Sequence, residues 1–298
     1  MSTPHILVIA TTGLALFVPA LAALARIRSH HRDAHICLIT APEVIDFAKS
    51  SPYVDEAWCE TLPNWWQRRD LRDMGERLRA KGFVAGYDLE DTPLSQALRA
   101  MMPATPWSTP VASPSVHLHD RLAAQIRSAG LGELLPHDLT WVARRVTGFD
   151  LPLKMTDPFV LIAADPSPSG EFWPQGNTTA LAQTLLAQGL IPVLVGLRPA
   201  GNLAQELRDN VASAVDLTGR ANLNDLVFLG WAARGAVGAD NGLMHLFAVA
   251  GCRAVVLYDN ASDPARNGQR GADVLILRRA RLADIPVGEV VAALKQRR

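Results

Sequence analysis

Gly235-Ala-Val-Gly-Ala-Asp-Asn-Gly-Leu-Met-His245 is a short apolar run that leads directly into a predicted helix. The pattern predicts a buried strand over residues 235–238 and a helix that starts after Asn241 and ends before Gly251, a suitable C-terminal cap. Asn241 can cap the helix, and Gly242 lets a ligand approach the backbone closely. Free amides and the helix dipole make such a terminus suitable for a diphosphate. The alternative is an ordinary N-cap with no ligand.

The same alternation of short apolar runs and amphipathic segments extends over the whole chain. It predicts strands at residues 5–10, 35–40, 54–58, 84–89, 158–164, 191–197, 214–217, 235–238 and 254–258. It predicts helices after Pro19 and at residues 42–50, 65–81, 94–102, 119–129, 177–188, 203–210, 223–233, 242–250 and 287–296. Apolar strands that alternate with helices indicate parallel sheets covered on both faces.

The chain divides into two halves. Residues 150–158 are rich in Pro, Asp and Thr and separate two repeats of the strand–helix pattern. The sequence therefore predicts an α/β protein with two Rossmann-like, doubly wound domains, residues 1–152 and 153–298. Such sheets bind ligands beyond the carboxyl ends of their strands, so two domains facing a central cleft would hold a donor and an acceptor.

Composition excludes several classes of protein. The 298 residues include 29 basic and 29 acidic ones, which gives no global field for nucleic acid. Cys37, Cys59 and Cys252 form no CxxC pair, which favours a reducing compartment. Residues 6–25 carry no charge and allow a membrane span or signal peptide as an alternative. However, no Lys or Arg precedes them, and we interpret them as strand, loop and helix of a cytoplasmic protein.

Common catalytic motifs are missing. No GxGxxG follows the first strand of either half, and the loop Gly196-Leu-Arg-Pro-Ala-Gly201 lacks the Lys-Ser/Thr of a phosphate loop. The chain has no GxSxG and no HExxH. It also has no D-x-D, which argues against a metal-dependent transferase.

Several segments together resemble glycosyltransferase family 9, the heptosyltransferases. Asp240-Asn-Gly-Leu-Met-His-Leu-Phe-Ala-Val-Ala-Gly251 is similar to the family block D-S/T-G-x-M-H-L-A-A-A-x-G. The segment 215–226 is similar to D-L-x-G-x-x-x-L-x-E-L, and residues 261–266 to P-T-D-P-x-R. Phe172-Trp-Pro174 matches part of K-x-W-P. The resemblance covers nearly the whole chain, with weaker motifs in the N-terminal half.

The resemblance implies a GT-B fold and a function. Members of this family transfer a heptose from an ADP-heptose to the lipopolysaccharide inner core, with inversion and without a metal or other cofactor. It implies an acceptor domain at residues 1–152 and a nucleotide-sugar donor domain at residues 153–298. The expected partners are a nucleotide-diphosphate sugar, with ADP-heptose favoured, and a glycolipid or glycan acceptor. The expected place is the cytoplasm, at the inner face of the inner membrane.

The resemblance also implies a set of donor-binding residues. Asp240 would contact the donor sugar or ribose, and the amides of Asn241 and Gly242 the diphosphate. His245 is either a donor contact or an ordinary helix histidine. Ser167 takes the place of a hydroxyl residue that holds phosphate, and Thr218 and Gly219 lie beside the nucleobase. The loop after the first strand adds Thr12 and Gly13 to the set.

Two positions depart from the family pattern. Gly13 stands where the family has the Asp that deprotonates the acceptor, and Glu171 stands where it has a Lys that neutralises the donor phosphate. One interpretation is an active transferase with a relocated base. Asp91 and Asp165 are then candidates, although both residue types also suit turns, and Arg198 or Arg266 supplies the positive charge. The other interpretation is a non-catalytic relative that binds a nucleotide sugar or a partner.

A basic, aromatic segment suggests where the acceptor binds. It comprises Trp65, Trp66, Arg68, Arg69, Arg72, Arg77, Arg79 and Lys81. One interpretation is a solvated helix face with buried tryptophans. The other is a peripheral contact with anionic lipid headgroups or a phosphorylated glycolipid.

Overall fold

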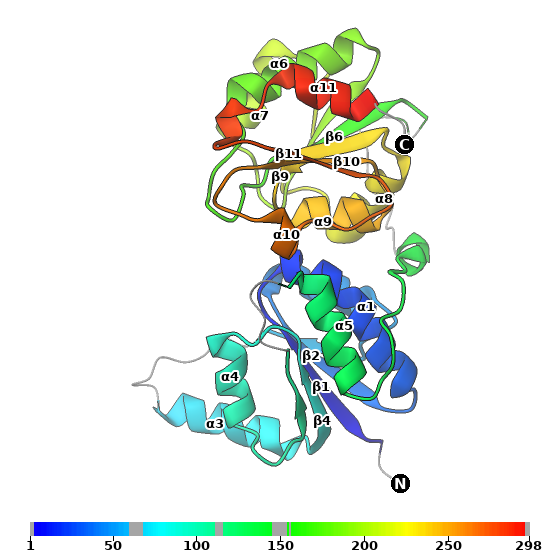
Figure 1. The fold of residues 1–298 in the computed structure, drawn as a ribbon, viewed down its shortest axis with the longest axis vertical. Helices are drawn as coiled ribbons and strands as arrows, with labels where there is room; N and C mark the ends of the chain where they lie inside the picture. The colour runs from blue at the N-terminus through cyan, green and yellow to red at the C-terminus, as the bar shows by residue number, and fades with distance from the viewer. Residues whose placement is uncertain (1–2, 60–67, 111–115, 145–153, 155, 296–298) are drawn as a thin grey trace. The chain divides into compact units, whose positions relative to one another are not determined.

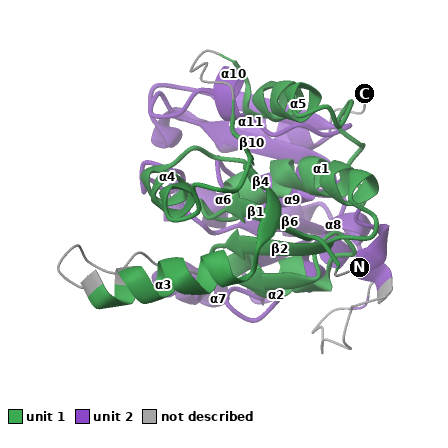
Figure 2. Cartoon of the chain, turned by 90° about the horizontal axis from the view of Figure 1, so that it is seen from below, with its two compact units in different colours: residues 1–138 green, residues 139–298 purple. Residues whose placement is uncertain are grey.

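Two compact units make up the chain in a computed structural model. They comprise Met1–Asp138 and Leu139–Arg298, distinguished by colour in Figure 2. The structure describes residues 3–59, 68–110, 116–144, 154 and 156–295. Each unit has its own parallel sheet with helices on both faces (Figure 1).

The first unit is built on a five-stranded sheet in the order β3-β2-β1-β4-β5. Its strands are β1 (His5–Ala10), β2 (His35–Thr40), β3 (Glu56–Trp58), β4 (Phe83–Asp88) and β5 (Trp107–Ser108), and all pairs are parallel. β1 and β2 are buried after their first residue, because helices cover them on both faces. Their uninterrupted apolar runs follow from this double burial.

The helices of this unit are α1 (Leu14–His30), η1 (Pro42–Val44), α2 (Ile45–Ser50), α3 (Arg68–Ala80), α4 (Pro93–Ala100) and α5 (Leu118–Ser128). α1 packs against α5 on one face of the sheet (Figure 1). On the other face, Met74 and Leu78 of α3 and Leu98 of α4 share a core with Leu7 and Ile9. α1 is buried on most sides, which explains the uncharged run in the sequence. Within the described residues, no helix has the length and apolar character needed to cross a membrane.

The second unit has a six-stranded sheet in the order β11-β10-β9-β6-β7-β8. Its strands are β6 (Phe159–Ala163), β7 (Ile191–Val195), β8 (Val215–Asp216), β9 (Gly235–Ala239), β10 (Ala254–Tyr258) and β11 (Val274–Arg278). The helices are η2 (Thr140–Arg144), α6 (Gln175–Ala187), α7 (Asn202–Asn210), α8 (Leu223–Ala232), α9 (Gly242–Val249), α10 (Pro264–Asn267), η3 (Leu282–Asp284) and α11 (Val287–Lys295).

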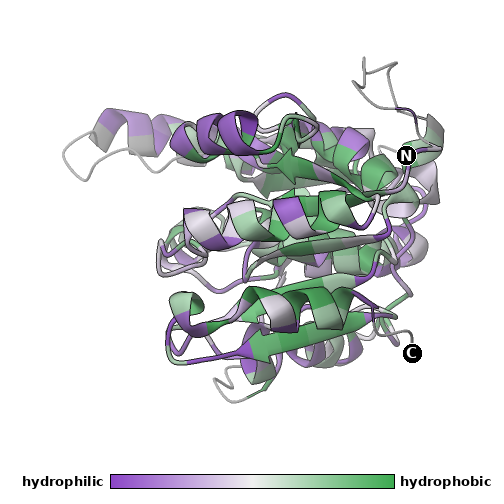
Figure 3. Ribbon diagram, turned by 90° about the horizontal axis from the view of Figure 1, so that it is seen from above, coloured by the Kyte–Doolittle hydropathy of each residue, from purple (hydrophilic) through white to green (hydrophobic). Residues whose placement is uncertain are grey.

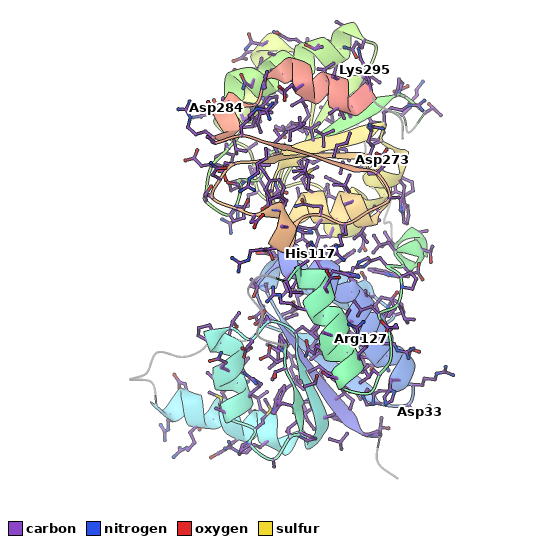
Figure 4. The ribbon with its side chains drawn as sticks, viewed as in Figure 1. Asp33, His117, Arg127, Asp273, Asp284 and Lys295 are labelled. Atoms are coloured by element: carbon purple, nitrogen blue, oxygen red, sulfur yellow. The ribbon has the colours of Figure 1, made fainter. Side chains whose placement is uncertain are left out.

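Helices again cover both faces. α6, α7 and α11 pack on one face and α8 and α9 on the other (Figure 1), over strands that are mostly hydrophobic (Figure 3). Asp284 and Lys295, labelled in Figure 4, mark the ends of η3 and α11. The Trp173 indole donates to the Ile285 carbonyl over 3.2 Å, and Arg253 donates to the Ala293 carbonyl while pairing with Asp273. These contacts hold the C-terminal segment on its own unit.

The predicted α/β class and the strand–helix alternation are confirmed, with differences at the sheet edges. β5 and β11 lie at edges and were not predicted. β5 has two residues, and β11 is only partly buried, so neither is a long apolar run. The predicted strand at 214–217 is reduced to Val215–Asp216. The two units divide after Asp138, whereas most of the predicted linker, residues 150–158, lies outside the described residues.

Candidate functional site

Each sheet has a point where the strand order reverses direction. In the first unit this point lies between β1 and β4, and in the second between β6 and β9. Ligands of doubly wound sheets bind beyond the carboxyl ends of the strands at this point. The loops after these strands contain most of the residues predicted from the sequence.

Asn241 organises the switch point of the second unit. Its Oδ1 accepts a hydrogen bond from the Met244 amide over 3.2 Å, and the residue is thus the N-cap of α9. Its Nδ2 donates to the Asp165 carbonyl over 2.8 Å. The cap predicted from sequence therefore also joins the ends of β6 and β9. The helix starts at Gly242, so its first amides lie at the carboxyl edge of the sheet.

Asp240 is held in a buried polar network that the sequence did not indicate. Its side chain is 4% exposed, and its Oδ1 accepts from the Tyr258 hydroxyl over 2.9 Å and from Gln269 Nε2 over 2.8 Å. The same hydroxyl lies 2.9 Å from Gln269 Oε1. Burial, reinforced by the charge of Asp240, raises the pKa of Tyr258, so its phenol stays neutral and can donate. This network fixes the carboxylate immediately before α9.

A pocket of about 520 Å³ lies beyond the ends of β6 and β7, within the second unit. It is lined in part by Asp165, Phe172 and Arg198. Phe172 is 55% exposed and offers an apolar surface in the lining of this pocket. The Asp165 carboxylate accepts the Leu197 amide over 3.2 Å. Arg198 is exposed, and its guanidinium has no partner among the residues that the structure describes.

The loop between β6 and α6 contains the predicted phosphate-binding serine. Ser167 is buried, and its Oγ lies 2.8 Å from Ser169 Oγ, which donates to Asp259 Oδ2 over 3.3 Å. The Ser167 amide donates to the Glu171 carbonyl over 2.8 Å and closes the loop. Glu171 itself is exposed. The sequence motifs did not indicate Asp259, whose carboxylate joins this loop through Ser169.

Thr218 and Gly219 support the pocket loop after β7. Thr218 Oγ1 accepts the Ala200 amide over 2.9 Å and donates to Asp216 over 2.7 Å. Gly219 has φ of 67°, and a β-carbon there would meet Pro199 Cδ at 2.6 Å. Both residues therefore position the segment that lines the pocket. His245 is buried on α9.

In the first unit, Glu90 joins the loops after β1 and β4. Its carboxylate accepts the amides of Thr11 and Thr12 over 2.7 and 2.9 Å and both threonine hydroxyls over 2.5 and 2.7 Å. It also accepts the Thr92 hydroxyl over 2.9 Å. The sequence pointed instead to its neighbour Asp91. A carboxylate after one strand, facing hydroxyls after the adjacent strand, is the signal that could have identified Glu90.

Asp91 and the buried Asp88 both pair with Arg99. Asp91 is exposed, with φ of 55°, and receives Arg99 Nη2 over 2.6 Å. Asp88 lies 3.0 Å from Arg99 Nε and accepts the Ser95 hydroxyl over 2.8 Å. Burial raises the pKa of Asp88 despite these partners. The structure thus places Asp91 in an ion pair with Arg99 of α4.

Gly13 precedes α1 and has φ of 93°, a conformation that favours glycine. A β-carbon at this position would lie 2.5 Å from Glu43 Oε1. That same oxygen accepts the Leu14 amide over 3.1 Å. The carboxylate of Glu43, which follows β2, therefore occupies the space beside Gly13.

One group of side chains has metal-ligand character. His35, Cys37 and Glu56 place one ligand atom each within 4.8 Å of one another, in the amino-terminal half of β2 and β3. Lys81 Nζ already lies 3.0 Å from Glu56 Oε2. Burial raises the pKa of the Cys37 thiol to about 12, so it remains protonated near neutral pH. The group lies at the amino edge of the sheet, opposite the edge that carries Thr11. Lys81 already pairs with its only carboxylate, that of Glu56.

Within the described residues, the predicted basic segment forms α3, which begins at Arg68. Met74 and Leu78 face the core. Arg72 lies 3.7 Å from both Asp73 and Glu76, so part of the positive charge is paired on the helix itself. Trp65 and Trp66 lie outside the described residues.

Comparison with known proteins agrees with this arrangement. Residues 122–282 match the model of glycosyltransferase family 9 (heptosyltransferase). Among solved structures, a family 9 glycosyltransferase from Veillonella parvula has a TM-score of 0.78 and 17% identity, with 98% of this chain and 97% of that one covered. ADP-heptose lipopolysaccharide heptosyltransferase II of E. coli gives 0.74 and 20%, covering 97% and 98%. E. coli heptosyltransferase WaaC with ADP gives 0.77 and 16%, covering 97% and 98%. No curated protein matches the chain in sequence.

Proposed function

The chain belongs to glycosyltransferase family 9 and has the GT-B fold, and on this premise we propose that it transfers a sugar from a nucleotide-diphosphate sugar to a glycan or glycolipid. ADP-heptose is the favoured donor, because a structural relative from E. coli is named for that donor. The observation that carries the proposal is the pocket beyond β6 and β7, with an unpartnered Arg198 in its lining among the described residues. Asp165 of the same lining accepts a hydrogen bond from Asn241, the N-cap of α9.

Charge and shape support donor binding at this edge of the second sheet. The first amides of α9 and the Arg198 guanidinium both favour a diphosphate, and a charge-assisted hydrogen bond contributes about 1.5–3 kcal/mol. The exposed ring of Phe172 offers an apolar face to a nucleobase or sugar. Arg198 thus supplies the positive charge that Glu171 does not.

We propose an inverting, metal-independent reaction. A direct displacement at the anomeric carbon inverts its configuration, and the leaving diphosphate needs stabilisation of its developing charge. Amides of α9 and the Arg198 guanidinium would provide such stabilisation without a metal ion. The sequence contains no D-x-D, which supports this assignment.

A second candidate is a non-catalytic relative that binds a nucleotide sugar or a protein partner. Two substitutions favour it: Gly13 stands where the family has an Asp, and Glu171 stands where it has a Lys. The two candidates share the donor pocket and differ only in whether sugar is transferred. Transfer to a lipid A precursor that carries inner-core sugars separates them.

The proposal includes a place of action, the cytoplasmic face of the inner membrane, and a role in lipopolysaccharide assembly. A glycolipid acceptor is anchored in that membrane, and the arginines of α3 suit its anionic headgroups. Binding to vesicles with and without anionic lipid is the direct measurement.

Calorimetry with ADP-heptose, and with GDP- and UDP-sugars as competitors, tests the donor site. Arg198→Gln should weaken ADP-heptose binding about tenfold or more, since it removes a charge-assisted contact. Arg234→Gln is the matched control, because Arg234 is exposed and precedes β9 at the amino edge of the same sheet. Equal affinities for wild type and Arg198→Gln would refute the site.

A further inference from the structure

We propose that Glu43 is the base that takes the proton from the acceptor hydroxyl. This inference rests on the proposed transferase function and concerns only the first unit. It starts from the carboxylate whose Oε1 would be 2.5 Å from a β-carbon at Gly13. A side chain on residue 13 and the carboxylate of Glu43 cannot both occupy this space.

The position suits an acceptor-activating group. Glu43 lies in η1, just beyond the carboxyl end of β2, which pairs with β1. It is exposed and can therefore meet a substrate. The Leu14 amide donates to Oε1 over 3.1 Å and orients the carboxylate. Oε2 has no hydrogen bond among the described residues, which leaves it available for an acceptor hydroxyl.

Other carboxylates at this edge are already engaged. Glu90 accepts hydrogen bonds from both the amides and the hydroxyls of Thr11 and Thr12. Asp88 is fully buried, and Asp91 pairs with Arg99 over 2.6 Å. Their hydrogen-bond partners hold them as structural groups. Glu43 alone, of the described carboxylates that these loops bring to the edge, is exposed and has no side chain bonded to it.

The absence of a side chain at residue 13 follows from the same geometry. With φ of 93°, Gly13 turns the chain from β1 into α1 and leaves room for the Glu43 carboxylate. Glu43 reaches this space from the β2 loop. The loop after β2, rather than the loop after β1, thus supplies the proposed base, and its carboxylate lies beside Gly13 at the start of α1.

The step balances as a single displacement. Glu43 takes the proton of the acceptor hydroxyl as the hydroxyl oxygen forms a bond to the anomeric carbon of the donor. The bond from that carbon to the diphosphate oxygen breaks, and its electron pair leaves with the nucleoside diphosphate. Neither an oxidant nor a metal is required.

The test measures transfer from ADP-heptose to a lipid A precursor with inner-core sugars. Glu43→Gln keeps an oxygen for the Leu14 amide but cannot take a proton, so kcat should fall on the order of 10²–10⁴-fold with unchanged ADP-heptose affinity. Glu43→Asp should retain part of the activity and the acid limb of the rate–pH profile, which Glu43→Gln should lose. Asp46→Asn, an exposed acid on α2, is the control and should keep wild-type activity.

Chemical rescue separates a base from a structural carboxylate. Formate should restore activity to Glu43→Ala in proportion to its concentration. Activity of Glu43→Gln within about twofold of wild type, or no rescue by formate, would overturn the assignment of the base and leave donor binding intact. Donor binding without transfer by the wild type would overturn it as well. Failure of the wild type to bind any of the nucleotide sugars would instead overturn the proposed function.

Discussion

At the scale of single residues, the proposed donor site depends on the environment of Asp240. Tyr258→Phe removes one of the two donors to its buried Oδ1 and should lower the free energy of unfolding by about 1–3 kcal/mol. It should also weaken ADP-heptose binding, because Asp240 immediately precedes the capping residue of α9. Tyr87→Phe is the control, since its buried hydroxyl contacts His31 in the other unit. Urea unfolding and calorimetry measure the two effects.

The pH dependence of the same residue has a definite sign. Because the pKa of Tyr258 is raised above 10.0, the ordinary value for a tyrosine, the neutral phenol stabilises the fold fully below that pH, and this contribution is lost as the pH rises further. The stability difference between wild type and Tyr258→Phe should therefore be constant from about pH 6 to 9 and shrink above about pH 10. A difference that grows with pH would contradict the assignment of Tyr258 as the neutral donor.

At the scale of elements, two helices of the second unit offer a matched pair of caps. Asn241 caps α9 through the Met244 amide over 3.2 Å, and Asn222 caps α8 through the Asp225 amide over 3.0 Å. Either Asn→Ala change should cost about 1 kcal/mol of stability. Only Asn241→Ala should also weaken ADP-heptose binding, because Asn241 joins α9 to the end of β6. Equal loss of affinity in both variants would indicate a general effect of stability.

At the scale of the whole molecule, the two units each carry proposed binding residues, and we expect a donor-dependent closure. Inter-domain motion is the ordinary expectation for such units. ADP-heptose should lower the radius of gyration measured by solution X-ray scattering, and Arg198→Gln should need a higher donor concentration for the same change. A radius of gyration that saturating ADP-heptose leaves unchanged would argue against closure.

The sequence by itself determined the architecture and the position of the turn before α9. Apolar runs, helical spacing and caps are local properties, so they placed most strands and the start of α9 at Asn241 within a few residues. The sequence did not predict the edge strands β5 and β11, because β5 is too short and β11 too exposed to form a buried apolar run. The motif around Asp240 then indicated the family.

Only the tertiary structure decided which side chains meet at the two switch points. Glu90 is 79 residues from Thr11, and the carboxylate of Glu43 reaches Gly13 from the loop of another strand. Tyr258 and Gln269 meet Asp240 from two further segments. Spacing along a chain carries no information on such pairs, because strand order brings their loops together. The sequence therefore indicated that Gly13 replaces the family's Asp, while the packing of β2 beside β1 places the Glu43 carboxylate next to it.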